Sequence, residues 1–236
     1  MADRPIIFSA PMVRALLAGR KTQTRRLLKP QPPEWATFCQ QILMFNIQHQ
    51  WVPSGLWQWC EPETTPPRSL RRWPIDAQGD HHYGMRLRYQ PGDRLWVREG
   101  WAPVWVIPQR AIYRADGERQ PGACCGCAWK PSIHMPRWAS RLTLVVTEVR
   151  LERLQDIRRE DAIAEGIQRV GGGFLRWENW SGAEGQSAFT PEAAYAVLWN
   201  SLHGPDAWAA NPWVVALTFS VAQRNIDAEA GNHDRD

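Results

Sequence analysis

The hydrophobic pattern at the start of the chain predicts a short strand followed by a short helix. Residues 4–10, RPIIFSA, are rich in isoleucine and phenylalanine, which favours a strand. Ser9 is suited to cap the following helix, and Pro11 to its first turn. Gly19 is suited to the position just after the helix ends. Apolar residues recur with helical spacing between these signals, at positions 12, 13, 16 and 17.

The rest of the chain contains further periodic segments separated by loops. Alternating or β-rich runs predict strands within residues 91–101, 110–116, 141–154 and 211–223. Helical patterns occur at 157–167 and 191–204, and each ends close to a glycine. The strands are not separated by regular crossover helices. We therefore expect an α+β fold built on a mixed or antiparallel sheet.

No internal repeat or composition break divides the chain, and residues 1–223 are expected to form a single domain. Residues 30–88 are rich in proline, glutamine and tryptophan and show poor periodicity, which is typical of an insertion. Residues 168–190 are expected to form a second long loop. The polar segment 224–236 is expected to be a disordered tail.

The composition of the chain indicates the cellular compartment in which the protein occurs. The chain has 236 residues, of which 44% are hydrophobic, and none of its apolar runs approaches the roughly 20 residues that a membrane span needs. The first residues lack the charged region, apolar run and cleavage site of a secretory signal. We therefore expect a cytoplasmic protein that does not associate with a membrane.

The charge distribution favours a phosphate-bearing partner. The formal net charge is only +4, but the segment from Arg14 to Lys29 contains six basic residues and no acid. Part of this cluster is also what the C-terminal end of a helix favours. Fifteen tryptophans are present, several of them in the loop-like segments, among them Trp51, Trp57 and Trp59. Such rings either stack on bases or hold loops against the body of the protein.

The five cysteines do not indicate a disulfide framework. Cys124 and Cys127 have the spacing of zinc ligands, and His134 follows seven residues later. No second pair of ligands completes a four-ligand site. We therefore expect reduced loop thiols and no cofactor, with zinc at these three residues as the weaker alternative.

Four motifs, in this order, resemble the ASCH domain of the PUA-like superfamily. They are Gly19-x-Lys21-x-x-Thr24-x-Arg26, Pro91-Gly92-Asp93 at the start of a strand, a long strand over 142–151 that runs into the helical segment 154–167, and a closing strand over 213–221. Residues 129–144 are similar to larger ASCH proteins of phages and prophages. The resemblance implies a small mixed β-barrel with peripheral helices and long loop insertions. It also implies that the partner is RNA or a modified nucleoside or nucleobase.

The residue at position 24 indicates which members of this family the chain resembles. The common form of the motif has glutamate at this position, whereas threonine is similar to the bacterial ASCH amidohydrolase that converts N4-acetylcytidine to cytidine. The resemblance implies that Lys21, Thr24 and Glu165 are catalytic, with Glu160 as the alternative to Glu165.

The residue types are consistent with that chemistry. Arginines 20, 25 and 26 disfavour the charged form of the neighbouring Lys21, which makes a neutral amine available as a base. The amine can activate the hydroxyl of Thr24 for attack on an acetyl carbonyl. The carboxyl group of Glu165 can then protonate the departing nitrogen.

Two other functions are consistent with the same residues. A ribonuclease would use Lys21 together with His134 or Arg137 in a cationic cleft, although a loop that packs Met135 and Trp138 into the body is the preferred interpretation of the segment around His134. A nucleic-acid-binding protein without catalysis would use basic and aromatic side chains, for which the candidates are Arg20, Arg25, Arg26, Lys130, Arg137 and Trp138. Whether the chain is an enzyme stays open at this point.

Overall fold

The computed structural model describes residues 2–32, 36, 38–60, 85–104, 107–117, 128–170, 176–178 and 187–228. In these ranges the chain is made mostly of strands with three α-helices, which confirms a mixed α+β structure. No helix in the described part of the chain has the length and apolar character needed to cross a membrane.

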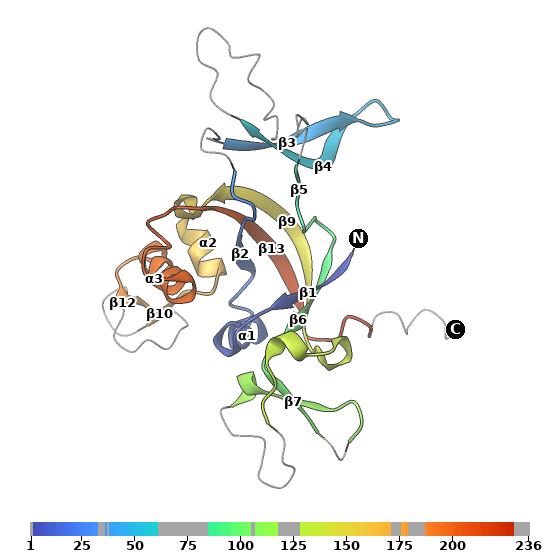
Figure 1. Ribbon diagram of the computed structural model, residues 1–236, viewed down its shortest axis with the longest axis vertical. Coiled ribbons are helices and arrows are strands. Elements are labelled where there is room, and N and C mark those ends of the chain that lie inside the picture. Colours follow the sequence, from blue (N-terminus) through green and yellow to red (C-terminus); the bar gives the residue numbers. More distant parts are fainter. Residues whose placement is uncertain are drawn as a thin grey trace.

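A five-stranded sheet forms the centre of the structure (Figure 1). β1 pairs with β6 in parallel, and the other three neighbouring pairs are antiparallel. Within the described residues the sheet is open, with β1 and β2 as its two edges, so the expected closed barrel is not formed. The strand order is β1 (Asp3–Ile7), β6 (Arg94–Arg98), β9 (Thr143–Arg153), β13 (Trp213–Ala222) and β2 (Gln23–Leu27).

A side chain nevertheless links the two edge strands. The guanidinium of Arg26 in β2 donates a hydrogen bond to the carbonyl oxygen of Ile7 in β1, with 2.6 Å between nitrogen and oxygen. Strands that can be joined in this way lie close together, so the sheet curves until its edges approach one another. The gap between them is spanned by a side chain instead of a backbone ladder.

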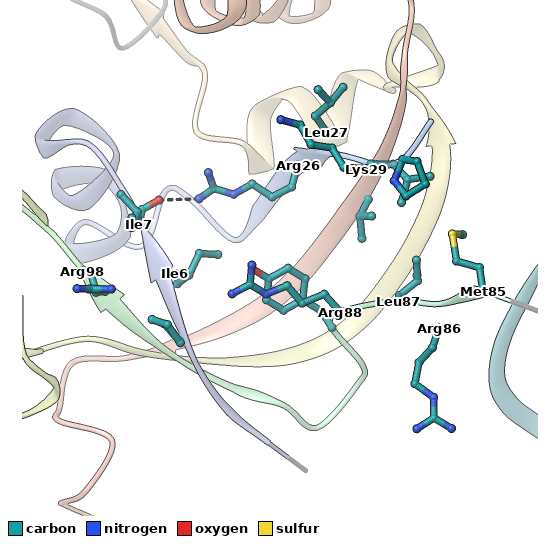
Figure 2. A pocket seen from close by; sticks show the side chains of 15 residues that line it. Ile6, Ile7, Arg26, Leu27, Lys29, Met85, Arg86, Leu87, Arg88 and Arg98 are labelled. Atoms are coloured by element: carbon teal, nitrogen blue, oxygen red, sulfur yellow. Dashed lines mark hydrogen bonds between the residues drawn. The ribbon is translucent and has the colours of Figure 1, made fainter. Parts of the chain in front are cut away.

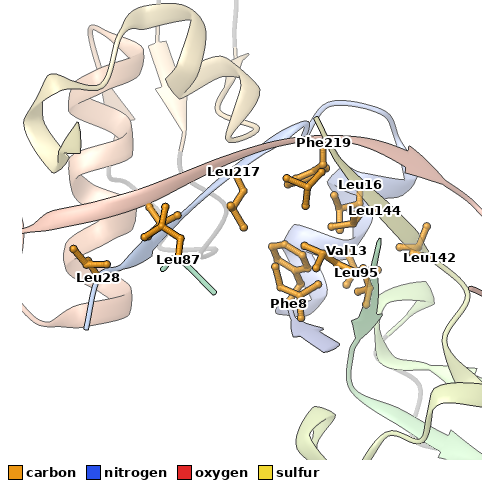
Figure 3. Packing of buried hydrophobic residues seen from close by; sticks show 14 of the residues in the cluster. Phe8, Val13, Leu16, Leu28, Leu87, Leu95, Leu142, Leu144, Leu217 and Phe219 are labelled. Atoms are coloured by element: carbon orange, nitrogen blue, oxygen red, sulfur yellow. The ribbon is translucent and has the colours of Figure 1, made fainter. Parts of the chain in front are cut away.

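Helices cover both faces of this sheet. α1 (Ala10–Leu17) packs on one face, while α2 (Arg159–Ala164) and α3 (Pro191–His203) pack on the other. β13 contributes to both cores because its side chains alternate, with Leu217 facing α1 and Val214 facing α2 and α3. Figure 3 shows the first core, which includes Phe8, Val13, Leu16, Leu95, Leu144, Leu217 and Phe219.

The predicted helices and the main predicted strands occur close to their expected positions, but β2 was not predicted. Residues 20–26 were interpreted as a helix end, whereas residues 23–27 pair with β13 at the edge of the sheet. The segment 168–190, expected to be a loop, contains strands of a small sheet. These are β10 (Gln168–Val170), β11 (Arg176–Glu178) and β12 (Ser187–Ala188).

The described part of the 30–88 insertion contains an antiparallel hairpin. β3 (Phe38–Phe45) pairs with β4 (Trp51–Cys60), and β5 (Met85–Arg86) pairs with β4 on its other side. Trp57 and Trp59 are partly buried against the main core, and the ring centroid of Trp59 lies 5.0 Å from that of Trp213. These two rings therefore hold the hairpin against the body, whereas Trp51 is 69% exposed.

A second hairpin and several short helical turns complete the described chain. β7 (Trp101–Pro103) pairs with β8 (Ala111–Tyr113) at the other end of the molecule (Figure 1). Four 3-10 turns occur at Arg114–Asp116, Ser132–His134, Arg137–Ala139 and Leu154–Asp156.

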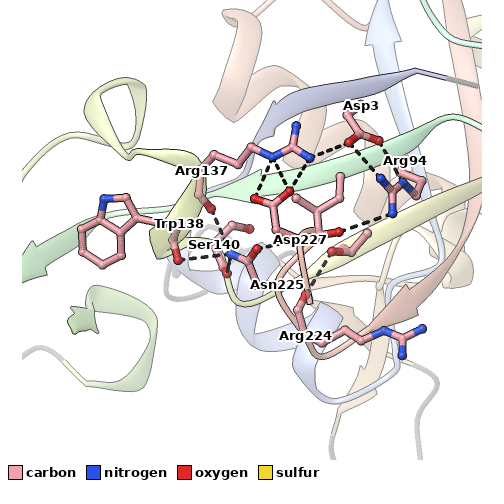
Figure 4. Close-up of polar contacts among 10 residues, drawn as sticks. Asp3, Arg94, Arg137, Trp138, Ser140, Arg224, Asn225 and Asp227 are labelled. Carbon is pink, nitrogen blue, oxygen red and sulfur yellow. Dashed lines mark hydrogen bonds and ion pairs between the residues drawn. The ribbon is translucent and has the colours of Figure 1, made fainter. Parts of the chain in front are cut away.

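The beginning of the segment expected to be a tail is packed against the domain (Figure 4). Ile226 is buried, and the amide of Asn225 donates to the carbonyl oxygens of three residues in the 137–140 turn. Arg137 forms ion pairs with Asp227 and with Asp3 of β1. The ordered chain thus extends at least to residue 228, and residues 229–236 lie outside the described ranges.

Candidate functional site

Lys21 is placed by the turn that follows α1. Gly19 adopts a left-handed conformation, with φ of +68°, and so ends the helix. The backbone N–H groups of Arg20 and Lys21 both donate to the carbonyl oxygen of Ala15. The turn directs the Lys21 side chain into the protein just before β2, where only 1% of the residue is exposed.

The Lys21 ammonium contacts Glu165 at the end of α2. Its Nζ lies 2.6 Å from Glu165 Oε2 and 2.9 Å from the Glu165 carbonyl oxygen. The two segments are also joined through their backbones, because the Thr22 N–H donates to the Ala164 carbonyl oxygen. Glu165 is 3% exposed, whereas Glu160 is exposed near the start of α2. The structure therefore brings Lys21 together with Glu165, not with the alternative Glu160.

Burial lowers the pKa of Lys21 below the ordinary lysine value. The nearby Glu165 carboxylate opposes this change, while the positive charges of Arg26 and Arg25 add to it. The direction agrees with the sequence-based expectation, but desolvation is the leading cause. Arg20, which was expected to contribute, is exposed and donates to the side chain of Gln168.

Arg25 lies in a buried cluster of carboxylates. Its side chain has no exposed surface, and it forms ion pairs with Glu165 at 3.3 Å, Glu152 at 2.7 Å and Asp161 at 3.2 Å. This position differs from the expected contact with nucleic acid, because the guanidinium is enclosed by protein. Its position makes Arg25 a residue that holds Glu165 in place.

Tyr195 of α3 is the third side chain around Glu165. Its hydroxyl is 3.3 Å from Glu165 Oε1, and burial raises the pKa of the phenol well above its usual value. Tyr195 therefore stays protonated and donates to the carboxylate. Tyr195 could not be recognised from the sequence, since its position in the helical pattern of 191–204 is that of an ordinary core residue.

Thr24 and Arg26 point to the opposite face of β2 from Arg25. The register pairs Thr24 with Leu217 and Arg26 with Val215, and both partners belong to the core under α1. Thr24 is 4% exposed. Among the residues that the structure describes, none forms a hydrogen bond with its hydroxyl, so the proximity to Lys21 expected for a catalytic threonine is not established by a contact.

The ring of Phe8 connects Lys21 to the face of the sheet that carries Arg26. The Lys21 Nζ lies 5.8 Å from the centroid of this ring, and the Arg26 guanidinium carbon lies 5.1 Å from it. Both cations are thus placed against one aromatic side chain. Phe8 and Arg26 therefore connect the Lys21–Glu165 pair to the cleft that Arg26 lines, although neither Lys21 nor Glu165 is among the described residues of that lining.

Arg26 lines a cleft of about 710 Å³ between β1, the end of β2 and residues 85–89 (Figure 2). The apolar part of its wall includes Ile6 and Leu87, and Tyr89 adds an aromatic ring. Among the described residues, the lining contains no acidic side chain but five cationic ones, namely Arg26, Lys29, Arg86, Arg88 and Arg98. Within the described chain, none of these five forms an ion pair with a carboxylate. The cleft is therefore suited to an anionic ligand.

The remaining predicted site residues lie apart from the Lys21–Glu165 pair. Lys130 is exposed above the ring of Trp101, and Trp138 is 40% exposed beside the same ring. Arg137 is already paired with two carboxylates, as described above. His134 is exposed, and no described contact joins it or Arg137 to Lys21.

Of the three proposed zinc ligands, only His134 belongs to the described part of the chain. Cys124 and Cys127 lie outside the described residues. In the part of the chain that is described, no group of three or more histidine, cysteine, aspartate or glutamate side chains is arranged to hold a metal ion.

Comparisons of the chain with protein-family models, curated proteins and solved structures find no match.

Proposed function

We propose that this protein is an ASCH-type, PUA-like domain that binds a modified cytosine and hydrolyses its N4-acyl amide. The observation that carries the proposal is the buried contact between Lys21 and Glu165, with 2.6 Å between the amine nitrogen and the carboxylate oxygen. Both groups are buried, and Arg26, which lies against the same Phe8 ring as Lys21, lines a cationic cleft. A buried acid and base near a cleft are properties of catalytic pairs. The curved sheet with approaching edges supports the PUA-like assignment.

The Lys21–Glu165 pair carries the acid and base functions with a single shared proton. With the proton on nitrogen the pair is an ammonium and a carboxylate, and with the proton on oxygen it is a neutral amine and a carboxylic acid. Both forms have zero net charge, and the second is the less costly one to bury. Burial, which lowers the pKa of Lys21, favours this second form, whereas Arg25 and Tyr195 contact Glu165 Oε1 and favour the carboxylate. The reaction uses the second form, which provides a base and an acid at the same time.

The reaction then needs a nucleophile, and Thr24 is the candidate. Its oxygen forms a bond to the acetyl carbon while its proton moves to the Lys21 amine. The bond from the acetyl carbon to the cytosine N4 breaks, and N4 takes the proton of the Glu165 carboxyl. Water next adds to the acetyl-threonine ester and gives a proton to Glu165. The ester bond breaks, the threonine oxygen regains its proton from Lys21, and acetic acid leaves.

Attack on the acetyl carbon places negative charge on the acetyl oxygen. Arg26 is the residue that we assign to stabilise this oxyanion. It lies on the same face of β2 as Thr24 and lines the cleft, whereas Arg25 is enclosed on the other face. A fixed cation beside a developing negative charge typically contributes several kcal/mol in a site that excludes water, of the order of 3 kcal/mol for one donor.

The experiment that tests the reaction is turnover of N4-acetylcytidine to cytidine by the purified protein. We expect the wild type to produce cytidine and acetate in equal amounts, Thr24→Ala to be inactive, and Thr24→Ser to retain activity because serine keeps the hydroxyl. Full activity in Thr24→Ala would exclude the acyl-threonine step and leave water as the nucleophile. No turnover by the wild type would contradict the hydrolase proposal.

The pH dependence of turnover gives a second test. The reactive pair holds one proton, so kcat/KM is expected to be bell-shaped: low at acid pH, where the pair holds two protons, and low at alkaline pH, where it holds none. Because burial lowers the pKa of Lys21, the alkaline fall is expected at lower pH than the pKa of an exposed lysine. A pH profile of wild-type kcat/KM would measure both limbs. A profile that only rises toward alkaline pH, in the range of ordinary lysines, would argue against a shared proton on a buried pair.

Binding without hydrolysis is the second candidate function. The observation that favours it is the cleft whose described lining has five cations and no acid, which would hold a nucleotide whether or not the amide is cleaved. For the ribonuclease alternative no such observation exists, since the described contacts do not bring Lys21 together with His134 or Arg137.

A further inference from the structure

We propose that the substrate carries a phosphate group, which binds in the cationic cleft beside the Lys21–Glu165 pair. This inference rests on the proposed function, which identifies the recognised base as a modified cytosine. It adds that this base belongs to a molecule with a phosphate group. The substrate would then be a cytidine nucleotide, free or within a strand, and not the nucleoside alone.

The charge of the cleft is the first argument. Its described lining combines five cations with no carboxylate, and an uncharged nucleoside would leave all of that charge without a counterpart. Surface arginines of a folded protein are usually balanced by nearby acids, as Arg94 is by Asp3 in this chain. A row of unbalanced guanidinium groups in a concave surface is the arrangement that phosphate groups bind.

The position of the cleft is the second argument. Arg26 belongs to the cleft wall and to the surroundings of Lys21, because its charge contributes to lowering the pKa of that amine and both side chains lie against Phe8. Arg26 thus links the cleft to the Lys21–Glu165 pair, which does not itself line the cleft among the described residues. The sugar and phosphate of a base bound near this pair are inferred to extend past Arg26 into the cleft. The volume of about 710 Å³ is in the range of pockets that enclose small ligands.

Arg88 is the best single candidate for the phosphate contact. It is exposed in the segment after β5 and lies across the cleft from β2. In Figure 2 its guanidinium and that of Arg26 project toward β1 from different walls, whereas Arg86 extends away from them. The Arg88 guanidinium carbon lies 5.6 Å from the ring centroid of Tyr89. Arg98 is less available, because it donates to the carbonyl oxygen of Ile133.

The test compares cytidine 5′-monophosphate with cytidine by isothermal titration calorimetry. We expect the monophosphate to bind the wild type at least about tenfold more tightly, as one charge-assisted contact provides. Arg88→Gln should remove most of this preference, and added salt should weaken binding of the monophosphate. Arg110→Gln is the matched control, since Arg110 is an exposed arginine in the distant turn between β7 and β8. It should leave the preference unchanged.

Equal affinities for the two compounds, no binding of the monophosphate, or an unchanged preference in Arg88→Gln would each overturn the phosphate site. The single-stranded trinucleotide CpCpC distinguishes the source of the phosphate. Tighter binding of CpCpC than of the monophosphate would identify a strand, and the reverse would identify a free nucleotide.

The outcomes separate this proposal from the hydrolase proposal. If the monophosphate binds through Arg88 but the wild type does not hydrolyse N4-acetylcytidine or its 5′-monophosphate, the phosphate site stands and the hydrolase proposal fails. If both are hydrolysed with the same kcat/KM and the monophosphate shows no binding preference, the hydrolase proposal stands and the phosphate site fails.

Discussion

Replacement of Lys21 by methionine is expected to reduce kcat for N4-acetylcytidine by about three orders of magnitude, within the range that removal of a general base causes. Methionine fills a similar volume but cannot accept the proton of a nucleophile. Glu165 would also lose the partner with which it shares a proton, so the acid and the base would be disabled together. The measurement is steady-state turnover of the variant beside the wild type.

Arg20→Met is the matched control for this experiment. Arg20 is the adjacent residue and carries the same charge, but it is exposed and contacts Gln168 instead of Glu165. Its loss should change turnover by less than about threefold, because an exposed charge contributes little to a buried site. Equal losses in the two variants would mean that positive charge, not the Lys21 amine, supports turnover. Wild-type activity in Lys21→Met would remove Lys21 from the mechanism.

Replacement of Arg25 by methionine is expected to lower the free energy of unfolding by about 3–5 kcal/mol, the usual cost of removing one partner from a buried ion pair. The arginine has no exposed surface and forms ion pairs with Glu152, Asp161 and Glu165. Its removal leaves three carboxylates close together with fewer compensating charges. Urea unfolding followed by circular dichroism at neutral pH would measure the change.

Arg150→Met provides the comparison for Arg25. Arg150 pairs with two of the same carboxylates, with 2.9 Å to Asp161 and 3.7 Å to Glu152, but 31% of its side chain is exposed. Water can replace it in part, so we expect a loss of about 1 kcal/mol or less. A variant Arg25→Met that is as stable as Arg150→Met would show that the carboxylate cluster does not depend on Arg25. The position of Glu165 would then have to be fixed by Lys21 and Tyr195.

The two residues Lys21 and Glu165 could be predicted from the sequence, but the contact between them could not. The resemblance named both residues, but they are 144 positions apart, and it left Glu160 as an alternative to Glu165. The structure places the C-terminal end of α2 against the start of β2, and only Glu165 lies at that end. A contact between distant segments depends on how elements dock, which local patterns do not encode.

β2 was missed for a related reason. The sequence from Arg20 to Arg26 is polar at nearly every position, so it lacks the alternation by which a half-buried strand is recognised. A cationic segment after a helix is also what helix-end electrostatics favours. β2 forms because its backbone pairs with β13 and because Arg25 forms ion pairs with buried carboxylates. Strand formation of this kind depends on neighbours more than on the intrinsic preference of the residues.

Local sequence patterns were enough to predict the periodic elements and to identify the residue types available for chemistry. Helical spacing, glycine ends and the alternation of buried strands are local properties, so α1, α3, β6, β9 and β13 were foreseeable. The burial and the contacts of each basic side chain depend on the tertiary structure. Arg20 is exposed, Lys21 and Arg25 are buried against carboxylates, and Arg26 lines the cleft. Neighbours in sequence are separated in this way because side chains of a strand alternate between its faces, and the packing of α2 and β1 makes those faces different.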